Sequence, residues 1–466
     1  MEKDSSYLPY DRPCEDLYAT RPSNQHNGLR YRIKIGLLGL FVLPAFIWLW
    51  LWPLSFPPSQ HCSGKLTIEQ RANKILTENP LIDGHNDLLI FLRYAYNNHI
   101  YSKSFQTKFE KGSLEQHVDL PRLDKGKQGG AFWSAFMPCP SGNGTDFSTR
   151  HYDSIVRATL DQIDLFNRLG SRYPKYFTPA FNHAEALQAF ERGRLISPLA
   201  IEGLHQIGNS VSTLRLYHSL GVRYATLTWN CHNAYADAAL ESDANMEPRV
   251  AVPYWGGLSP AGIDAVVEMN RMGMIVDLSH VSKDTMKDVL IGPDNGDFAG
   301  SLAPPIFSHS SAYSICPHPR NVPDDVLQMV KKRNSLVMVN FSPSFISCVP
   351  SNSSNSSSGL PDFYPPNATL HQVVRHIRYI GELIGYDHVG IGTDFDGIDS
   401  TPVGLEDVSK FPDLVAELLK QGVTDGDVAK VVGRNLLRVW KEVDEVAEKL
   451  QRSIPPLEDE VRNPWV

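Results

Sequence analysis

The sequence predicts an α/β protein whose main domain is a (β/α)8 barrel of the TIM type, preceded by one transmembrane helix. Two observations lead to this prediction. From about Leu66 to Leu450, short apolar segments alternate with amphipathic ones, as strands and helices do around a parallel sheet. Ahead of that region, a run of about 20 residues carries no charge, which is enough to cross a bilayer as a helix.

The N-terminal part of the chain predicts a membrane anchor. Residues 1–34 are polar and become basic toward their end, so they are predicted to be cytoplasmic. Residues 35–54 are predicted to be a transmembrane signal-anchor helix, and 55–65 a short stalk. A cleaved signal peptide is less favoured, because the leader is long and no A-x-A cleavage site follows. The barrel, 66–450, and an irregular tail, 451–466, are therefore expected to be extracellular or lumenal.

Potential glycosylation sites agree with that location. N-x-[ST] sequences predict glycosylation at four positions, Asn143, Asn352, Asn355 and Asn367. Asn340 has the same pattern, but it lies in LVMVNFS, which is typical of a buried strand. We do not expect Asn340 to be modified.

The cysteines also suit an oxidising compartment. Five of them follow the predicted membrane span, at Cys62, Cys139, Cys231, Cys316 and Cys348. They allow two disulfides with one cysteine left over, and the spacing alone does not fix the pairing. No CxxC pair occurs, which excludes a structural zinc finger.

Eight segments are predicted to be strands because each is a short apolar run. They are 81–87, 129–137, 195–203, 224–229, 273–280, 305–310, 335–342 and 388–397. Amphipathic helices are expected between them, for example within 148–169, 259–273 and 368–385. Eight parallel strands joined by helices indicate a barrel, whose active site lies where the strands end. A doubly wound open sheet is the main alternative, but no glycine-rich phosphate motif follows the first strand.

Nucleic acid is not an expected partner. The net charge is −8 and the isoelectric point is near 6.1. No basic cluster with interleaved aromatic residues occurs in the sequence.

Polar residues of metal-binding type end five of the predicted strands. They are His85 and Asp87, Glu202, His280, His309 and Asp394. Each alone is more often structural, but a buried group of carboxylates and imidazoles is costly without compensating positive charge. Three histidines and several carboxylates, with no thiolate, suit zinc or a similar divalent ion. The sequence therefore predicts a metal site at the carboxyl end of a barrel of the metal-dependent hydrolase kind.

These ligands are too many for one tetrahedral site that keeps a position open for water. Two metal ions that share one carboxylate would use them all and could hold a bridging hydroxide as nucleophile. Asp394 would carry the proton between that hydroxide and the leaving group. Asp396, two residues later, is interpreted as structural.

The motifs DGHNDL, AIEG, DLSHVS, FSHSSAYS, PRNVPDD and IGTDFDG occur in this order. Together they resemble the membrane dipeptidase (renal dipeptidase) family of zinc metallopeptidases over most of residues 70–445. The resemblance implies a (β/α)8 barrel with two zinc ions per chain that hydrolyses dipeptides to free amino acids.

The resemblance also implies a role for each matching residue. His85, Asp87 and Glu202 would hold one zinc ion, and Glu202 would bridge to a second ion held by His280 and His309. Asp394 would match the catalytic acid and base. Arg320 in PRNVPDD would bind the substrate carboxylate, which suits a guanidinium fork.

The family's paired cysteines correspond to Cys139 with Cys231 and Cys316 with Cys348. Cys62 would then be a free stalk cysteine, or it would join two chains, because the family tends to form homodimers.

The sequence departs from the family pattern at the fourth strand. Members commonly have a histidine there, in LTH, which binds substrate and stabilises the developing oxyanion. This chain has LTWNCHN, with Trp229 in that place and His232 as a candidate substitute from the loop. Leu204 also stands where glycine is common. Animal members are usually held by a C-terminal glycolipid, whereas this chain is expected to be held by its N-terminal helix.

These observations lead to the hypothesis of a membrane-anchored dinuclear zinc dipeptidase. One alternative is a barrel metallohydrolase that acts on another carboxylate-bearing amide or on a lactone. Another is a catalytically weak surface protein, for which Trp229 is the one argument.

Overall fold

The computed structural model describes residues 66–459, except 142–143, 243–246, 295 and 352–357. Eight parallel strands form one sheet in the order β1-β2-β3-β4-β7-β8-β9-β12. Their bounds are β1 Leu81–Asn86, β2 Gln128–Ser134, β3 Leu199–Glu202, β4 Val222–Thr226, β7 Ile275–Asp277, β8 Ile306–Phe307, β9 Leu336–Val339 and β12 Val389–Ile391. Each lies in or overlaps one of the eight predicted segments, so the predicted barrel strands are confirmed.

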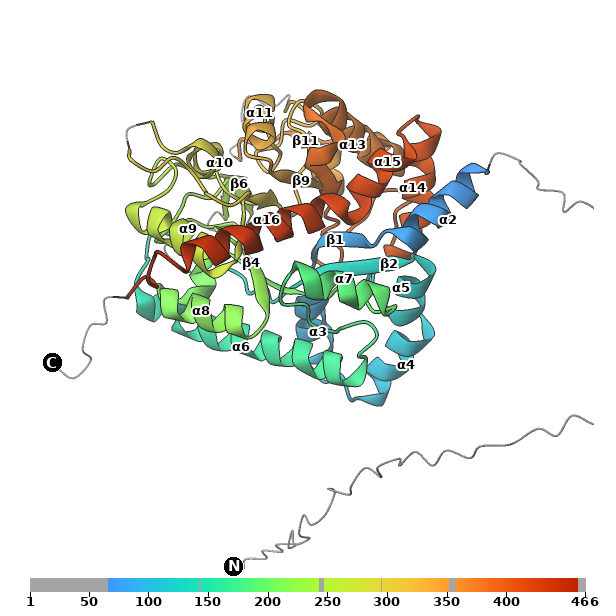
Figure 1. Ribbon diagram of the computed structural model, residues 1–466, viewed down its shortest axis with the longest axis horizontal. Helices are drawn as coiled ribbons and strands as arrows, with labels where there is room; N and C mark the ends of the chain where they lie inside the picture. The colour runs from blue at the N-terminus through green and yellow to red at the C-terminus, as the bar shows by residue number, and fades with distance from the viewer. Residues whose placement is uncertain (1–65, 142–143, 243–246, 295, 352–357, 460–466) are drawn as a thin grey trace, which may run out of the picture. The chain divides into compact units, whose positions relative to one another are not determined.

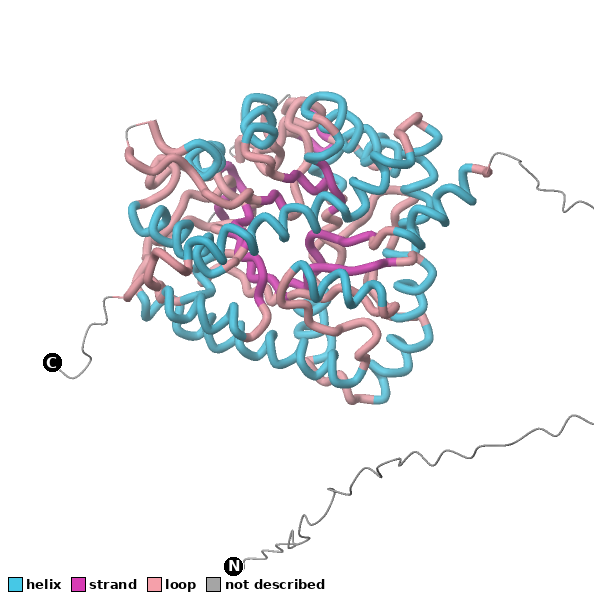
Figure 2. Tube along the Cα trace, in the orientation of Figure 1, coloured by secondary structure: helices cyan, strands magenta, loops and turns pink. Residues whose placement is uncertain are grey.

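The first and last strands meet and bring the sheet close to a full barrel. Asn86 forms a parallel bridge with Phe395. The amide of Asp87 donates to the carbonyl of Phe395 at 2.9 Å, and that of Asp394 donates to the carbonyl of His85 at 3.1 Å. The strands lie at the centre of the molecule with helices around them (Figure 2). Backbone hydrogen bonds thus join the first and last strands of the sheet next to the residues predicted to bind metal.

Helices follow the strands and cover the outside of the barrel (Figure 1). They are α2 Ile68–Glu78, α3 Leu88–Tyr96, α4 Lys103–Lys111, α5 Leu120–Lys125, α6 Thr149–Arg172, α7 His183–Glu191, α8 Val211–Ser219, α9 Pro260–Met272, α10 Lys283–Ile291, α11 Asp324–Lys332, α12 Pro343–Ile346, α13 Leu370–Ile384, α14 Phe411–Lys420, α15 Asp425–Ala429 and α16 Asn435–Leu450. Two short hairpins also form, β5 Leu240–Ser242 with β6 Pro248–Val250 and β10 Cys348–Val349 with β11 Asp362–Phe363.

Local sequence explains where these helices begin and end. In α9, the Ser259 hydroxyl accepts a hydrogen bond from the amide of Gly262, and Pro260 occupies the first turn. The helix ends at Gly273, whose φ of 81° favours a residue without a side chain. These signals occur in the segment 259–273, which was predicted to be a helix.

The amino end of the barrel is filled with apolar side chains. Ile275, Ile306 and Leu336 are the first residues of their strands, and they belong to one buried cluster with Trp440 of α16. The Trp440 ring lies 5.5 Å from that of Phe132 in β2. Because this end is closed by packing, substrate access is confined to the opposite end, where the strands terminate.

The predicted tail contacts the barrel. Residues 451–459 contain no helix or strand, and the carboxylate of Asp459 accepts hydrogen bonds from the amides of Val211 and Ser212, each at 2.8 Å. This contact satisfies free amides at the start of α8.

The predicted membrane span at 35–54, the segment 1–34 and the stalk lie outside the described residues. No helix within the described part of the chain is long and apolar enough to span a membrane.

The disulfides Cys139–Cys231 and Cys316–Cys348 are both present, which confirms the pairing that the family resemblance implied. Asn340 is fully buried, as its place in a strand predicted, and Asn367 is exposed. Asn143, Asn352, Asn355 and Cys62 lie outside the described residues.

Candidate metal centre and substrate cavity

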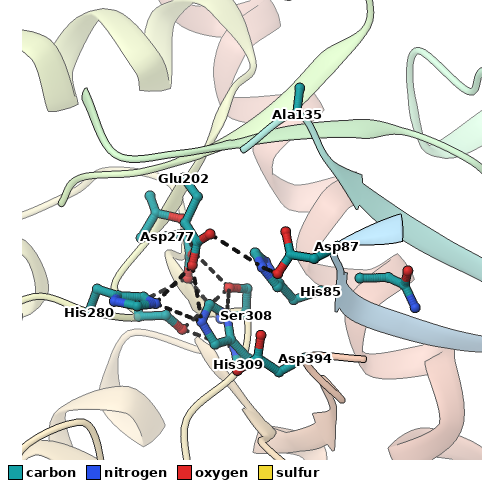
Figure 3. A network of polar contacts seen from close by, with 12 residues as sticks. His85, Asp87, Ala135, Glu202, Asp277, His280, Ser308, His309 and Asp394 are labelled. Atoms are coloured by element: carbon teal, nitrogen blue, oxygen red, sulfur yellow. Dashed lines mark hydrogen bonds and ion pairs between the residues drawn. The ribbon is translucent and has the colours of Figure 1, made fainter. Parts of the chain in front are cut away.

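The predicted ligands gather at the carboxyl ends of their strands (Figure 3). His85 is in β1, Asp87 directly follows it, and Glu202 ends β3. His280, His309 and Asp394 follow β7, β8 and β12 by two or three residues. All six are buried. Residues that are far apart in the sequence therefore meet at one end of the barrel, as the strand pattern predicted.

The carboxylate of Glu202 lies between two groups of ligands. Its Oε1 lies 2.8 Å from His280 Nε2 and 3.4 Å from His309 Nε2. Its Oε2 lies 3.6 Å from His85 Nε2, which in turn is 3.1 Å from Asp87 Oδ2. Ligand atoms within each group lie within 4.8 Å of one another. One oxygen therefore faces each group, which is the arrangement that a bridging carboxylate needs.

A hydrogen bond to Nδ1 orients each of the three imidazoles. His85 Nδ1 lies 2.6 Å from the Tyr224 hydroxyl, which itself donates to the carbonyl of Gly84. His280 Nδ1 lies 2.9 Å from the amide oxygen of Asn230. Because these acceptors take the Nδ1 proton, Nε2 keeps its lone pair for a metal ion.

The third imidazole has a longer chain of partners. His309 Nδ1 lies 2.8 Å from the Ser308 hydroxyl, and that hydroxyl donates to Asp277 Oδ2 at 2.6 Å. Asp277 also accepts a hydrogen bond from the hydroxyl of Thr226 on the neighbouring strand. The ring orientation of His309 is thus fixed by a buried network that spans three strands.

The chemistry of these atoms fits divalent cations. His280 Nε2 and His309 Nε2 lie only 3.0 Å apart, and Asp87 Oδ1 is buried with no hydrogen-bond partner in the described part of the chain. Burial raises the pKa of the Glu202 carboxyl well above its ordinary value. Burial also lowers the pKa values of His280 and His309, so both rings stay neutral and able to bind metal. Keeping the carboxylates ionised in such a place requires additional positive charge.

Asp394 faces the same site from the last strand. Asn340 donates a hydrogen bond from Nδ2 to Asp394 Oδ2 at 3.0 Å, and burial raises the pKa of Asp394 to about 6. Asp394, Asp396 and His280 have φ values of 66°, 67° and 68°. This left-handed conformation is strained for residues other than glycine, and such strain is concentrated at functional sites.

Asp396 has a different environment. Its Oδ1 accepts a hydrogen bond from the amide of His117 at 2.7 Å, and its own amide donates to His117 Nδ1 at 2.9 Å. This paired contact ties the loop after β12 to the segment before α5, in line with the structural role expected of Asp396.

Arg320 is buried in the wall of the same cavity. It is only 1% exposed, and none of its three guanidinium nitrogens has a hydrogen-bond partner among the described residues. Burial lowers its pKa to about 10, so it remains charged at neutral pH. The cavity has a volume of about 800 Å³ and also exposes Asp87, Glu202 and Asp394. A buried unpaired guanidinium is costly, and a bound carboxylate would offset that cost.

Comparison with known proteins places this arrangement in a family. The family model described as membrane dipeptidase (peptidase family M19) matches residues 69–454. Dipeptidase aclJ of Aspergillus oryzae is 45% identical over 446 residues, which cover 94% of each chain. An uncharacterized dipeptidase of Schizosaccharomyces pombe is 42% identical and covers 94% of this chain and 96% of its own. The chain belongs to the membrane dipeptidase family.

Solved structures agree with the fold of this chain. A metallopeptidase named dipeptidase AC is 25% identical, with a TM-score of 0.63, over 78% of this chain and 98% of its own. A probable dipeptidase, PvdM of Pseudomonas aeruginosa, is 21% identical, with a TM-score of 0.67, over 82% of this chain and 99% of its own. The resemblance noted in the sequence motifs is therefore confirmed, and the chain is a hydrolase of the metallopeptidase class.

The departures from the family pattern have distinct locations in the structure. Trp229 is half-buried and lines the cavity. His232 is not among the residues that line the cavity. Its Nδ1 lies 2.9 Å from Asp237 Oδ1, so the ring would have to leave this carboxylate to reach a substrate. Leu204, two residues after Glu202 in the sequence, is fully buried.

The sequence did not single out the residues that orient the ligands. Tyr224, Asn230, Asp277 and Ser308 have this role, and Asn340 orients Asp394 in the same way. Asp277 and Ser308 lie in the motifs DLSH and FSHS, so their closeness to His280 and His309 was a usable signal. Tyr224 is 139 residues from His85, and no local pattern connects them.

Proposed function

We propose that this chain hydrolyses dipeptides to free amino acids with two zinc ions bound at the metal centre. The observation that carries the proposal is the position of Glu202, whose two carboxylate oxygens face two separate ligand groups. The unpartnered guanidinium of Arg320 in the same cavity supports a substrate with a carboxylate.

His85, Asp87 and Glu202 would hold one zinc ion, and Glu202, His280 and His309 the other. When bound, such ions supply hydroxide at neutral pH and polarise a carbonyl oxygen. The hydrogen bonds to Nδ1 of the three histidines keep their Nε2 atoms directed at the centre.

The remaining steps use groups of the chain itself. Arg320 holds the free carboxylate of the substrate, which limits the substrate to a peptide with one residue after the scissile bond. Asp394 accepts the proton of the attacking water and delivers it to the leaving amine. Asn340 keeps the Asp394 carboxylate in place through its hydrogen bond to Oδ2.

Amino-acid release from Ala-Ala and from Ala-Ala amide tests this proposal. Chelator-treated protein should be inactive, zinc should restore release from Ala-Ala, and the amide should react far more slowly because Arg320 has no carboxylate to bind. Glu202→Gln should lose both metal and activity. A Glu202→Gln protein that keeps two metal ions and full activity would contradict the proposal.

Another hydrolase activity is the competing function. Arg320 would equally suit other amides or lactones that bear a carboxylate, because one fold supports many reactions. Turnover of an N-acyl amino acid by the zinc-loaded protein, without any turnover of dipeptides, would favour this alternative.

We further propose that residues 35–54 anchor the chain in a membrane with the barrel on the extracellular or lumenal side. The uncharged run in the sequence and the two disulfides of the barrel support this topology. Glycosidase treatment of the protein from its native cells should increase its electrophoretic mobility. Extraction by alkaline carbonate without detergent would contradict the anchor.

A further inference from the structure

We propose that Trp229 and Phe136 form the surface that selects the N-terminal side chain of the substrate, and that large apolar side chains are preferred there. This inference rests on the proposed dipeptidase function and names the substrate class. The two residues are called the aromatic wall below. Neither residue is a predicted metal ligand, and Trp229 stands where family members commonly have histidine.

The two rings of the aromatic wall contact each other, and a disulfide lies close to them. The rings of Phe136 and Trp229 lie 4.9 Å apart at an angle of 55°, and both residues line the cavity. The Trp229 ring lies 6.3 Å from that of His280, so the wall adjoins the metal centre. The disulfide between Cys139 and Cys231 joins the two loops that carry these rings, only two or three residues away from them. The wall is therefore held in place covalently.

The strand order places the wall opposite the carboxylate-binding group. Phe136 follows β2 and Trp229 follows β4, so they flank β3, the third strand of the sheet. Arg320 and Phe345 follow β8 and β9, the sixth and seventh strands. In a closed ring of eight strands, the sixth lies opposite the second, and the seventh lies opposite the third.

This placement orients a bound dipeptide. With its carboxylate on Arg320 and its peptide bond at the Glu202 centre, the chain runs from the β8–β9 side toward the β2–β4 side. The N-terminal residue then lies at the aromatic wall. The side chain of the C-terminal residue remains near Phe345, which already lies 5.2 Å from the Arg320 guanidinium carbon.

The chemistry of the wall favours apolar side chains. Apart from Glu202, which ends β3, the described residues that line the cavity from the loops after β2, β3 and β4 are Phe136, Trp229 and Asn230. The amide oxygen of Asn230 is already bonded to His280. With no spare charge to pair a charged side chain, this side gains most by burying apolar area against the two rings. A volume of about 800 Å³ leaves room for a large side chain.

Two matched series of dipeptides test the inference, X-Gly and Gly-X, with X as Ala, Leu and Phe. For the zinc-loaded protein, we expect kcat/KM to rise roughly tenfold from Ala-Gly to Phe-Gly, and to change less from Gly-Ala to Gly-Phe. Trp229→Ala should remove most of the rise in the X-Gly series. Trp229→His should do the same, and it provides a second variant if the alanine protein folds poorly. Bound zinc and the melting temperature are measured for each protein.

Phe363→Ala is the matched control, since Phe363 lines the same cavity from the side of β9 and is exposed. It should leave the Phe-Gly to Ala-Gly ratio unchanged. A flat X-Gly series in the unmodified protein would overturn the inference. So would an equal loss on both series in Trp229→Ala, which would show an effect on the metal centre. If the zinc-loaded protein released no amino acid from any dipeptide, the proposed dipeptidase function itself would be wrong. This outcome differs from a flat X-Gly series, which would overturn only the inference about the aromatic wall.

Discussion

The amide oxygen of Asn230 lies 2.9 Å from Nδ1 of His280 and fixes the ring that faces Glu202. Asn230 directly follows Trp229, so the segment that departs from the family pattern also supports a candidate metal ligand. Partners of this kind typically change metal affinity by 10–100-fold when they are removed.

Asn230→Ala should therefore weaken zinc binding by roughly tenfold or more, because the His280 ring loses the bond that orients it. Competition with a chelator of known affinity measures this change. Asn230→Asp, which keeps an acceptor oxygen, is the control and should bind zinc more tightly than the alanine variant. Equal zinc affinity in all three proteins would show that Asn230 does not orient His280.

Removing the charge of Arg320 should raise stability and reduce activity together. Its guanidinium has no hydrogen-bond partner among the described residues, and replacing buried charged groups with apolar side chains of similar volume is often neutral or stabilises a protein by about 1–4 kcal/mol. Arg320→Met should thus increase the free energy of unfolding in urea, while kcat/KM for Ala-Ala falls at least a hundredfold. A stability loss in Arg320→Met would show that the guanidinium has partners in the folded protein.

The sequence predicted that the candidate ligands would cluster, because they belong to its own strand pattern. His85, Glu202 and His309 each lie at or just after the end of an apolar run, and parallel strands bring those ends together. The residues that orient them were not predictable in this way. Tyr224 reaches His85 across the barrel interior, and this contact depends on strand register rather than on a local pattern.

The expectation for His232 shows the same limit. Asp237 accepts hydrogen bonds from the amides of Tyr254, Trp255 and Gly256, and it also lies 2.9 Å from His232 Nδ1. The loop after β4 is thus folded around a buried carboxylate that is five residues further on. From the sequence, His232 was simply the nearest imidazole to Trp229.

Acid should destabilise the fold partly through His376, which lies in α13 and is not one of the candidate metal ligands. Its Nε2 lies 2.9 Å from the carbonyl of Ile346, its Nδ1 accepts from the amide of Ala312, and burial lowers its pKa to about 4 from an ordinary value of 6.5. The unfolded chain therefore binds this proton more tightly. The stabilisation of the folded state by neutral His376 is complete above pH 6.5. It is lost as the pH falls toward 4, by up to about 1.4 kcal/mol per pH unit.

His376→Gln should accordingly flatten the dependence of unfolding free energy on pH between 6.5 and 4. Urea denaturation of chelator-treated protein at several pH values measures both slopes, so that metal loss does not contribute. Burial also lowers the pKa values of His205 and His218 to about 4, and they act in the same direction in both proteins. Parallel curves for the two proteins would mean that His376 titrates alike when folded and unfolded.

Gly392, two residues before Asp394, should tolerate no side chain. A Cβ at this position would lie 1.8 Å from the carbonyl oxygen of Ser308, in the strand connection that leads to His309. Gly392→Ala must therefore separate the last strand from its neighbours across the barrel, which displaces both His309 and Asp394. We expect a loss of several kcal/mol in stability, or no soluble protein, because backbone rather than a flexible side chain has to move.

Gly426→Ala is the matched control for Gly392→Ala. Gly426 lies in α15, where a Cβ would meet nothing closer than the Thr424 hydroxyl oxygen at 3.9 Å. Alanine there should be neutral or should stabilise by up to about 1 kcal/mol, since it favours the helix. The melting temperature and zinc content of both variants measure these effects. A Gly392→Ala protein that melts like the unmodified chain and binds two zinc ions would contradict this prediction. It would show that the segments that directly follow β8 and β12 can move apart enough to admit a side chain.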